Sequence, residues 1–110
     1  MAKATLDFSQ FQRSLRDERP PDACVPALRA LWHDATGNTD RAFEIACRFE
    51  DNDSARVRAY LHRKRGESTQ ATIWYWKAGV RPGDGNLEDE WRDIVQSILT
   101  QDIVMSAYEF

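Results

Sequence analysis

The side chains best suited to chemistry in this chain are two histidines in equivalent settings. His33 and His62 each stand four residues before a glycine, Gly37 or Gly66, and the two settings lie 29 residues apart. Histidine is a common zinc ligand, and the carboxylates of Asp34 and Asp40 are close in the sequence, but a zinc site needs three or four ligands at a recognisable spacing, which is missing here. A histidine in the last turn of a helix also interacts with the negative helix end without any metal. We therefore expect no metal site here.

Catalytic motifs are missing from the chain as well. It contains no glycine-rich phosphate loop, no HExxH sequence and no nucleophile elbow. We expect no catalytic residue, no cofactor and no enzymatic activity. A regulatory protein that binds a small ligand or a metal through the histidines and aromatic side chains stays open as the alternative function.

Positive charges gather on one predicted helix, at Arg56, Arg58, Arg63, Lys64 and Arg65. The formal net charge of the chain is −3, which argues against a nucleic acid as partner. One interpretation is a solvated face whose ion pairs, to carboxylates between residues 84 and 93, are each worth less than about 1 kcal/mol. The other is a patch for an acidic peptide, because arginine binds carboxylates at two points. The candidate partner-binding residues on this helix are Arg56, Arg63 and Lys64.

Aromatic residues are densest at Trp74, Tyr75 and Trp76. At helical spacing, Trp74 and Tyr75 face inward, whereas Ile73, Trp76 and Val80 form a second apolar stripe on the opposite side, which we call the outer stripe.

Two explanations for the outer stripe are open. The last predicted helix could cover it through Trp91 and Val95, or a partner protein could bind it, since exposed aromatic stripes mark interfaces. Trp76 is therefore the fourth candidate partner-binding residue.

The elements that position these residues follow from the recurrence at 29 residues. A small residue follows each glycine at the same distance, Ala42 after Gly37 and Ala71 after Gly66, which is typical of repeated helical hairpins. Apolar periodicity, caps and breakers predict about six helices and no strand, over residues 6–16, 22–36, 38–50, 54–66, 68–79 and 87–100. Asp22 and Asn86 are the expected caps of the second and sixth helices, and the pattern does not decide the order of the tail after Thr100.

The central hairpins resemble tetratricopeptide repeats. In that family a glycine ends the first helix and a small residue follows five positions later, as Ala71 follows Gly66; Tyr75, Ala78 and Pro82 match further positions of the second unit. The period of 29 is shorter than the family's, and its tryptophan–glycine pattern is missing from the first helices. Residues 62–79 also resemble small bacterial proteins of unknown function. The resemblance implies an interaction scaffold.

Composition completes the expectations. The 110 residues, 42% hydrophobic and 30% charged, fit one all-α domain over 1–110, with antiparallel hairpins at about 23–51 and 52–83 and a capping helix at about 87–100. With no signal peptide or membrane span in the pattern, and with Cys24 and Cys47 expected as reduced thiols, we expect a cytoplasmic bacterial protein.

The function expected from the sequence is a non-enzymatic interaction module or adaptor. Its partner is expected to be a protein or peptide of acidic character, with a homodimer as an open alternative and with neither nucleic acid nor membrane involved.

Overall fold

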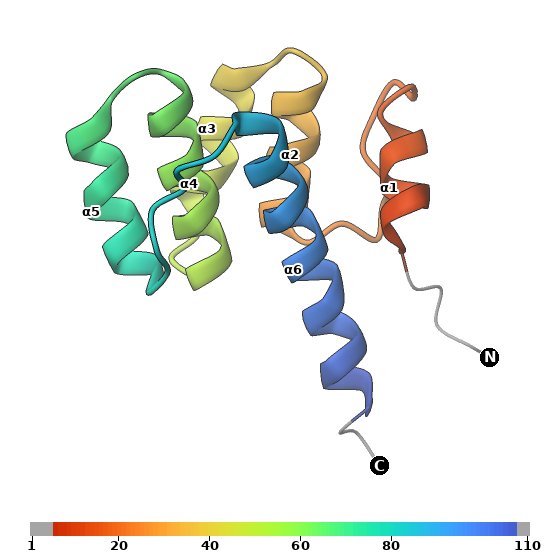
Figure 1. Cartoon of the computed structure of the whole chain (residues 1–110). Helices are drawn as coiled ribbons and strands as arrows, with labels where there is room; N and C mark the ends of the chain where they lie inside the picture. Colours follow the sequence, from red (N-terminus) through yellow and green to blue (C-terminus); the bar gives the residue numbers. More distant parts are fainter. Residues whose placement is uncertain (1–5, 108–110) are drawn as a thin grey trace.

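The computed structural model describes residues 6–107, with side chains to residue 100. Its architecture is all-α, as the sequence predicts, and the described residues contain no strand (Figure 1). The helices are α1 (Phe8–Ser14), α2 (Pro26–Ala35), α3 (Thr39–Arg48), α4 (Asn52–Lys64), α5 (Ser68–Ala78) and α6 (Leu87–Ala107). The undecided tail therefore begins as a continuation of α6, and its last residues, 108–110, lie outside the described part.

The two central hairpins turn in the same way. Gly37 has φ 92° and Gly66 has φ 78°, a left-handed conformation that closes a helix end at little cost for glycine. The next N–H after each glycine donates back to a histidine carbonyl, from Asn38 to His33 at 2.8 Å and from Glu67 to His62 at 2.9 Å. The glycine turns therefore occur where the sequence predicts them, while membership of the tetratricopeptide family stays a prediction.

The helix starts follow local chemistry, with two corrections to the sequence analysis. Asn86 caps α6 by accepting from the Asp89 N–H at 2.7 Å, as predicted. Asp22 does not cap α2, which begins at Pro26 after Val25, because proline fits the first helical position, where no N–H partner is needed. α1 is also shorter than expected, since Asp7 caps it and the chain leaves the helix after Ser14.

The main core lies where α2 meets α1, α4 and α6. Its largest fully buried side chains come from four helices and include Phe11, Leu28, Leu31, Val57, Leu61, Ile94 and Val95, and α3 adds the smaller Ala42. Trp91 of α6 packs beside Phe11 with ring centroids 5.9 Å apart and donates its indole N–H to the Leu31 carbonyl at 3.1 Å. α6 therefore closes the core next to α1.

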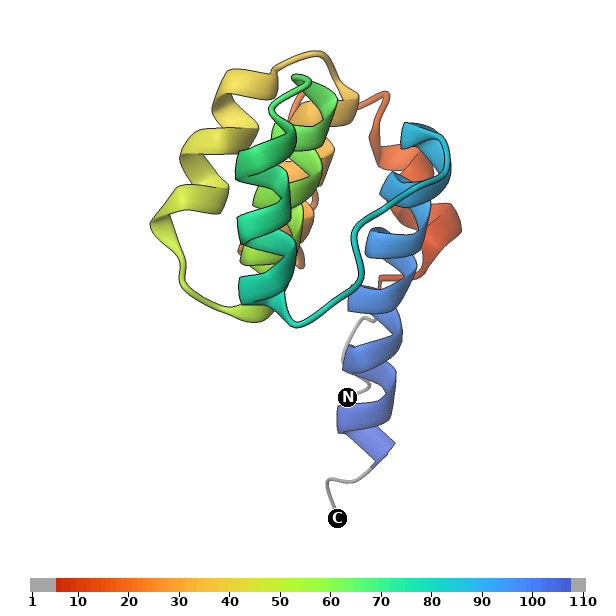
Figure 2. The same ribbon diagram turned by 60° about the vertical axis from the view of Figure 1, so that its left-hand side comes forward.

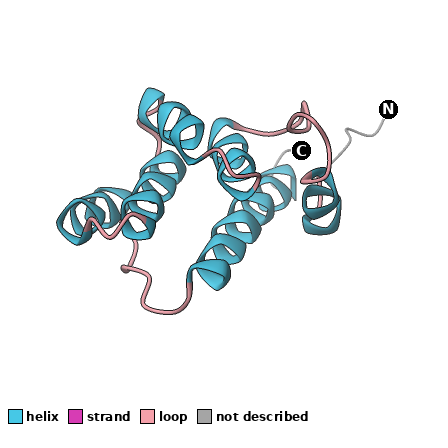
Figure 3. Ribbon diagram, turned by 90° about the horizontal axis from the view of Figure 1, so that it is seen from above, coloured by secondary structure: helices cyan, strands magenta, loops and turns pink. Residues whose placement is uncertain are grey.

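This placement overturns one expectation. Trp91 and Val95 face the main core, so α6 does not cover the outer stripe of α5. α5 and α1 stand at opposite ends of the molecule, with α6 nearer to α1 (Figures 1 and 3). The inner side of α5 packs on α4 through a small cluster centred on Ala59, Ala71 and Tyr75. The segment between α5 and α6 runs the full length of α5 to reach the start of α6 (Figure 2).

Candidate functional site

The last turn of α4 is held by two buried carboxylates, and the first is Asp34 of α2. The Asp34 side chain is 1% exposed. It accepts from Lys64 Nζ at 2.9 Å, from Thr39 Oγ1 at 3.1 Å and from the Tyr60 hydroxyl at 3.3 Å. Three donors on one carboxylate compensate for its removal from water and join α2 to α4.

The second buried carboxylate is Glu90 of α6, which is 8% exposed. It accepts from Arg63 Nη1 at 2.6 Å and from the Tyr75 hydroxyl, so it connects α6 to both α4 and α5. A Cβ added at Gly83 would collide with this carboxylate, and Arg63 also donates to the Gly85 carbonyl. The segment after α5 therefore seals this ion pair from one side.

These contacts alter the interpretation of the positively charged residues on α4. The sequence hypothesis requires Arg56, Arg63 and Lys64 to be exposed together, whereas Arg63 is held by α6 and Lys64 pairs with a buried carboxylate. Arg65 pairs with Asp40 at 2.8 Å, and Arg56 is half-buried. Reversing the charges at Arg63 and Lys64 would bring carboxylates together, so that substitution would unfold the protein as well as alter a surface. A partner-binding role for these cations stays a prediction.

The tyrosines in the two clusters are held in their neutral form. Burial raises the pKa of Tyr60, and the charge of Asp34 and its hydrogen bond raise it further. Burial likewise raises the pKa of Tyr75, with the hydrogen bond to Glu90 and the charge of that carboxylate as the next causes. Both hydroxyls therefore act as donors to carboxylates and are poorly suited to act as bases.

The two histidines have different surroundings, and their side chains make different contacts. Burial lowers the pKa of His33, with the charges of Arg41 and Arg29 adding to the effect, so the charged form expected at a helix end is disfavoured. His62 Nδ1 lies 3.0 Å from Glu67 Oε1, while its Nε2 is buried without a hydrogen-bond partner in the described part of the chain. Among the described residues, no three His, Cys, Asp or Glu side chains are grouped to hold a metal ion.

Among the described residues, the outer stripe of α5 contains the most exposed large hydrophobic side chain. Trp76 is 79% exposed and Ile73 is 43% exposed, while Val80 is half-buried. The neighbouring charges are positive: Lys77 follows Trp76 directly, the exposed Arg81 follows α5, and α5 itself carries no carboxylate. The stripe is therefore an apolar strip with a cationic border.

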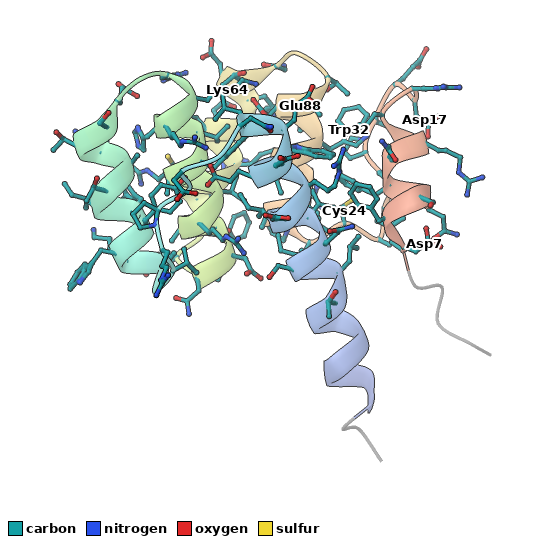
Figure 4. The ribbon with its side chains drawn as sticks, in the orientation of Figure 1. Asp7, Asp17, Cys24, Trp32, Lys64 and Glu88 are labelled. Carbon is teal, nitrogen blue, oxygen red and sulfur yellow. The ribbon has the colours of Figure 1, made fainter. Side chains whose placement is uncertain are left out.

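A hollow of about 440 Å³ lies between α1, α2, α4 and the start of α6. Its polar lining includes Asp34, Lys64, Glu88 and Arg92, and its apolar lining includes Trp91. Figure 4 places Lys64 and Glu88 at the same end of the molecule, where α4 ends and α6 begins. This hollow could not be predicted from the sequence, because its lining comes from four helices whose packing no local pattern specifies.

Within the described residues, no helix is both long and apolar enough to span a bilayer. Comparison of the chain with protein-family models, curated proteins and solved structures found no match.

Proposed function

We propose that this protein is a non-enzymatic interaction module of the bacterial cytoplasm, which binds a protein partner through the outer stripe of α5. The observation that carries the proposal is the exposure of Trp76 at 79% beside the exposed Ile73. Tryptophan is enriched among the residues that dominate binding energy at interfaces, because it buries a large area with few rotatable bonds.

Contacts between α4 and α5 support a binding role for this surface. The Trp74 ring lies between two cations, with the Arg58 guanidinium 3.9 Å and the Lys77 ammonium 4.4 Å from its centroid. Contacts of this kind fix the aromatic ring and the two cations relative to α5. A fixed surface loses less conformational entropy when a partner binds.

The charges around the stripe define the chemistry of the partner. Lys77 and Arg81 border the stripe, and no carboxylate lies within α5. The complementary partner is a protein segment with apolar side chains on one face and aspartate or glutamate at its edges, such as an amphipathic helix. This is the acidic partner expected from the sequence, bound at α5 instead of at the basic end of α4.

The test is photo-crosslinking in the source cells. A photoreactive amino acid replaces Ile73, which leaves Trp76 in place, and the matched control carries it at Glu44, the exposed position 29 residues earlier on α3. We expect a discrete adduct with a second protein from position 73 and none from position 44. Mass spectrometry of the adduct should map the crosslink to an apolar segment flanked by acidic residues.

Three outcomes would contradict the proposal. Equal adducts from both positions would show that the stripe has no preference for a partner. An adduct of the chain with itself would replace the acidic partner by a homodimer. A crosslinked segment with basic flanks would contradict the charge argument.

A further inference from the structure

The hollow beside α6 has the size and the lining of a small-molecule site. Its volume of about 440 Å³ falls within the range of about 300–1,000 Å³ that is usual for ligand pockets. Leu15, Leu87 and Trp91 supply apolar walls, and the buried Asp34 and Tyr60 form part of the lining. This hollow is separate from the outer stripe, because α5 contributes no residue to its lining.

Two cations of the lining have hydrogen-bonding capacity to spare. Lys64 donates to Asp34, but an ammonium carries three donors, and the Lys64 side chain is 38% exposed. Arg92 lies 3.7 Å from Asp89, which is too long for a hydrogen bond, and its side chain is 50% exposed. Asp34 fixes the position of the Lys64 ammonium, so the two cations can receive a carboxylate without reorganising the core.

One carboxylate of the lining also has no cation beside it among the described residues. Glu88 is exposed in the first turn of α6 and contacts no cation in the described part of the chain, whereas Asp34 is already neutralised by Lys64. The charges of the lining therefore balance as two positive and two negative groups. A ligand that satisfies Lys64, Arg92 and Glu88 together carries one carboxylate and one ammonium.

We propose that this hollow binds a free α-amino acid with an apolar side chain. The carboxylate of the ligand pairs with Lys64 and Arg92, its ammonium pairs with Glu88, and its side chain packs on Trp91, Leu15 and Leu87. Each charged contact contributes about 1.5 kcal/mol or more, so removing one should weaken binding about tenfold. The site adds a small-molecule input to a protein whose partner surface lies on α5.

The test is a titration followed by NMR through the indole N–H signals, using phenylalanine as the probe. The chain has four tryptophans, so Trp91 reports on the hollow while Trp76 serves as an internal control on the outer stripe. We expect saturable shifts of the Trp91 signal at ligand concentrations up to about 1 mM, with Trp76 unchanged. Phenylpropanoate, which lacks the ammonium, and phenethylamine, which lacks the carboxylate, should each bind about tenfold more weakly.

Two exposed substitutions sharpen the assignment without disturbing the core. Arg92→Gln should weaken phenylalanine about tenfold and leave phenethylamine unchanged, whereas Glu88→Gln should weaken phenylalanine and leave phenylpropanoate unchanged. Asp93→Asn on α6 and Arg48→Gln on α3 are the matched controls, since both residues are exposed outside the hollow.

The proposal is overturned if phenylalanine gives no saturable Trp91 shift, or if either analogue binds as tightly as phenylalanine. Equal effects of the hollow variants and their controls would overturn it too. None of these results bears on crosslinking at α5, so the two proposals can fail separately.

Discussion

The outer sides of α3 and α5, each on the helix that follows a glycine turn, stand 29 residues apart in the sequence, yet their chemistry is opposite. Glu44 and Cys47 on α3 stand 29 residues before Ile73 and Trp76 on α5, and all four are exposed. The scaffold therefore does not require an apolar surface at these positions, because α3 meets the same requirement with polar and small residues. The difference supports the proposal that the outer stripe serves binding.

The two buried carboxylates, Asp34 and Glu90, also differ in their surroundings. Asp34 ties α2 to α4 at the wall of an open hollow, whereas Glu90 ties α6 to α4 and α5 beneath the segment that contains Gly83. Each carboxylate accepts from one tyrosine and one cation, but Lys64 is 38% exposed and Arg63 is 25% exposed. The cation of the Asp34 cluster is thus the more exposed of the two, although the Asp34 side chain, at 1%, is less exposed than that of Glu90, at 8%.

The largest effect on stability should come from removing the buried carboxylate of Glu90. Glu90→Ala removes the carboxylate that accepts from both Arg63 and Tyr75 and opens the contact between α6 and the α4–α5 hairpin. We expect the free energy of unfolding to fall by about 3–5 kcal/mol, the usual cost of removing one partner of a buried ion pair. Urea denaturation followed by circular dichroism measures this.

The matched variants for this prediction are Asp34→Asn and Glu88→Ala. Asp34→Asn should cost about 1–3 kcal/mol, because Lys64 can turn toward water and the amide still accepts a hydrogen bond. Glu88→Ala removes an exposed carboxylate of the same helix and should change stability by less than about 0.5 kcal/mol. A smaller loss for Glu90→Ala than for Asp34→Asn would contradict the contrast between the two clusters.

The second prediction compares the small residues that follow the two glycine turns. Ala42 is 0% exposed in the main core, and Ala71 is 4% exposed in the small cluster beneath α5. Ala42→Leu and Ala71→Leu should each cost about 1–3 kcal/mol by overpacking, with the larger loss at Ala42 because its surroundings cannot move into solvent. Melting curves that leave both variants unchanged would show that these alanines do not set the distance between helices.

The third prediction concerns alkaline pH. The folded protein raises the pKa of Tyr60 and Tyr75 above the ordinary value of about 10, so both contribute stability below that pH, and the contribution is lost as the pH rises above it. Burial also raises the pKa of Cys24 from 9.0 to about 11, which adds a loss in the same direction.

Unfolding in urea at about pH 8 and about pH 10.5 measures this loss, with Cys24→Ala as the background that removes the thiol contribution. Adding Tyr60→Phe or Tyr75→Phe to that background should reduce the difference between the two pH values. An unchanged difference in both tyrosine variants would show that these hydroxyls ionise as freely in the folded protein as in the unfolded chain.

The local features of the two hairpins could be predicted from the sequence, whereas their long-range contacts could not. The glycine turns and the cap at Asn86 follow from local chemistry, and the structure agrees with them. The pairing of Arg63 with Glu90 and of Lys64 with Asp34 joins residues 27 and 30 positions apart. Such pairs depend on how helices cross, which periodicity alone does not specify.

The position of α6 shows the same limit for the outer stripe. The apolar pattern around Trp91 fits a helix that covers either α5 or the α1–α2 core, and it is the aromatic contacts with Phe8 and Phe11 that favour the core. The sequence therefore allowed both a covered and an exposed Trp76, and it could not decide between the two. Its partner-binding role stays a prediction.

The central claim, that the outer stripe is the partner surface, is tested by giving α5 the chemistry of α3. The variant Ile73→Glu with Trp76→Ser should raise the Kd for the crosslinked partner by at least about 100-fold, since two residues of an interface centre are lost. Its free energy of unfolding should stay within about 0.5 kcal/mol of the parent protein, as both positions are exposed. Glu44→Ala with Cys47→Ser on α3 should leave both quantities unchanged. An unaltered Kd in the α5 variant, measured by calorimetry with the purified partner, would contradict the account.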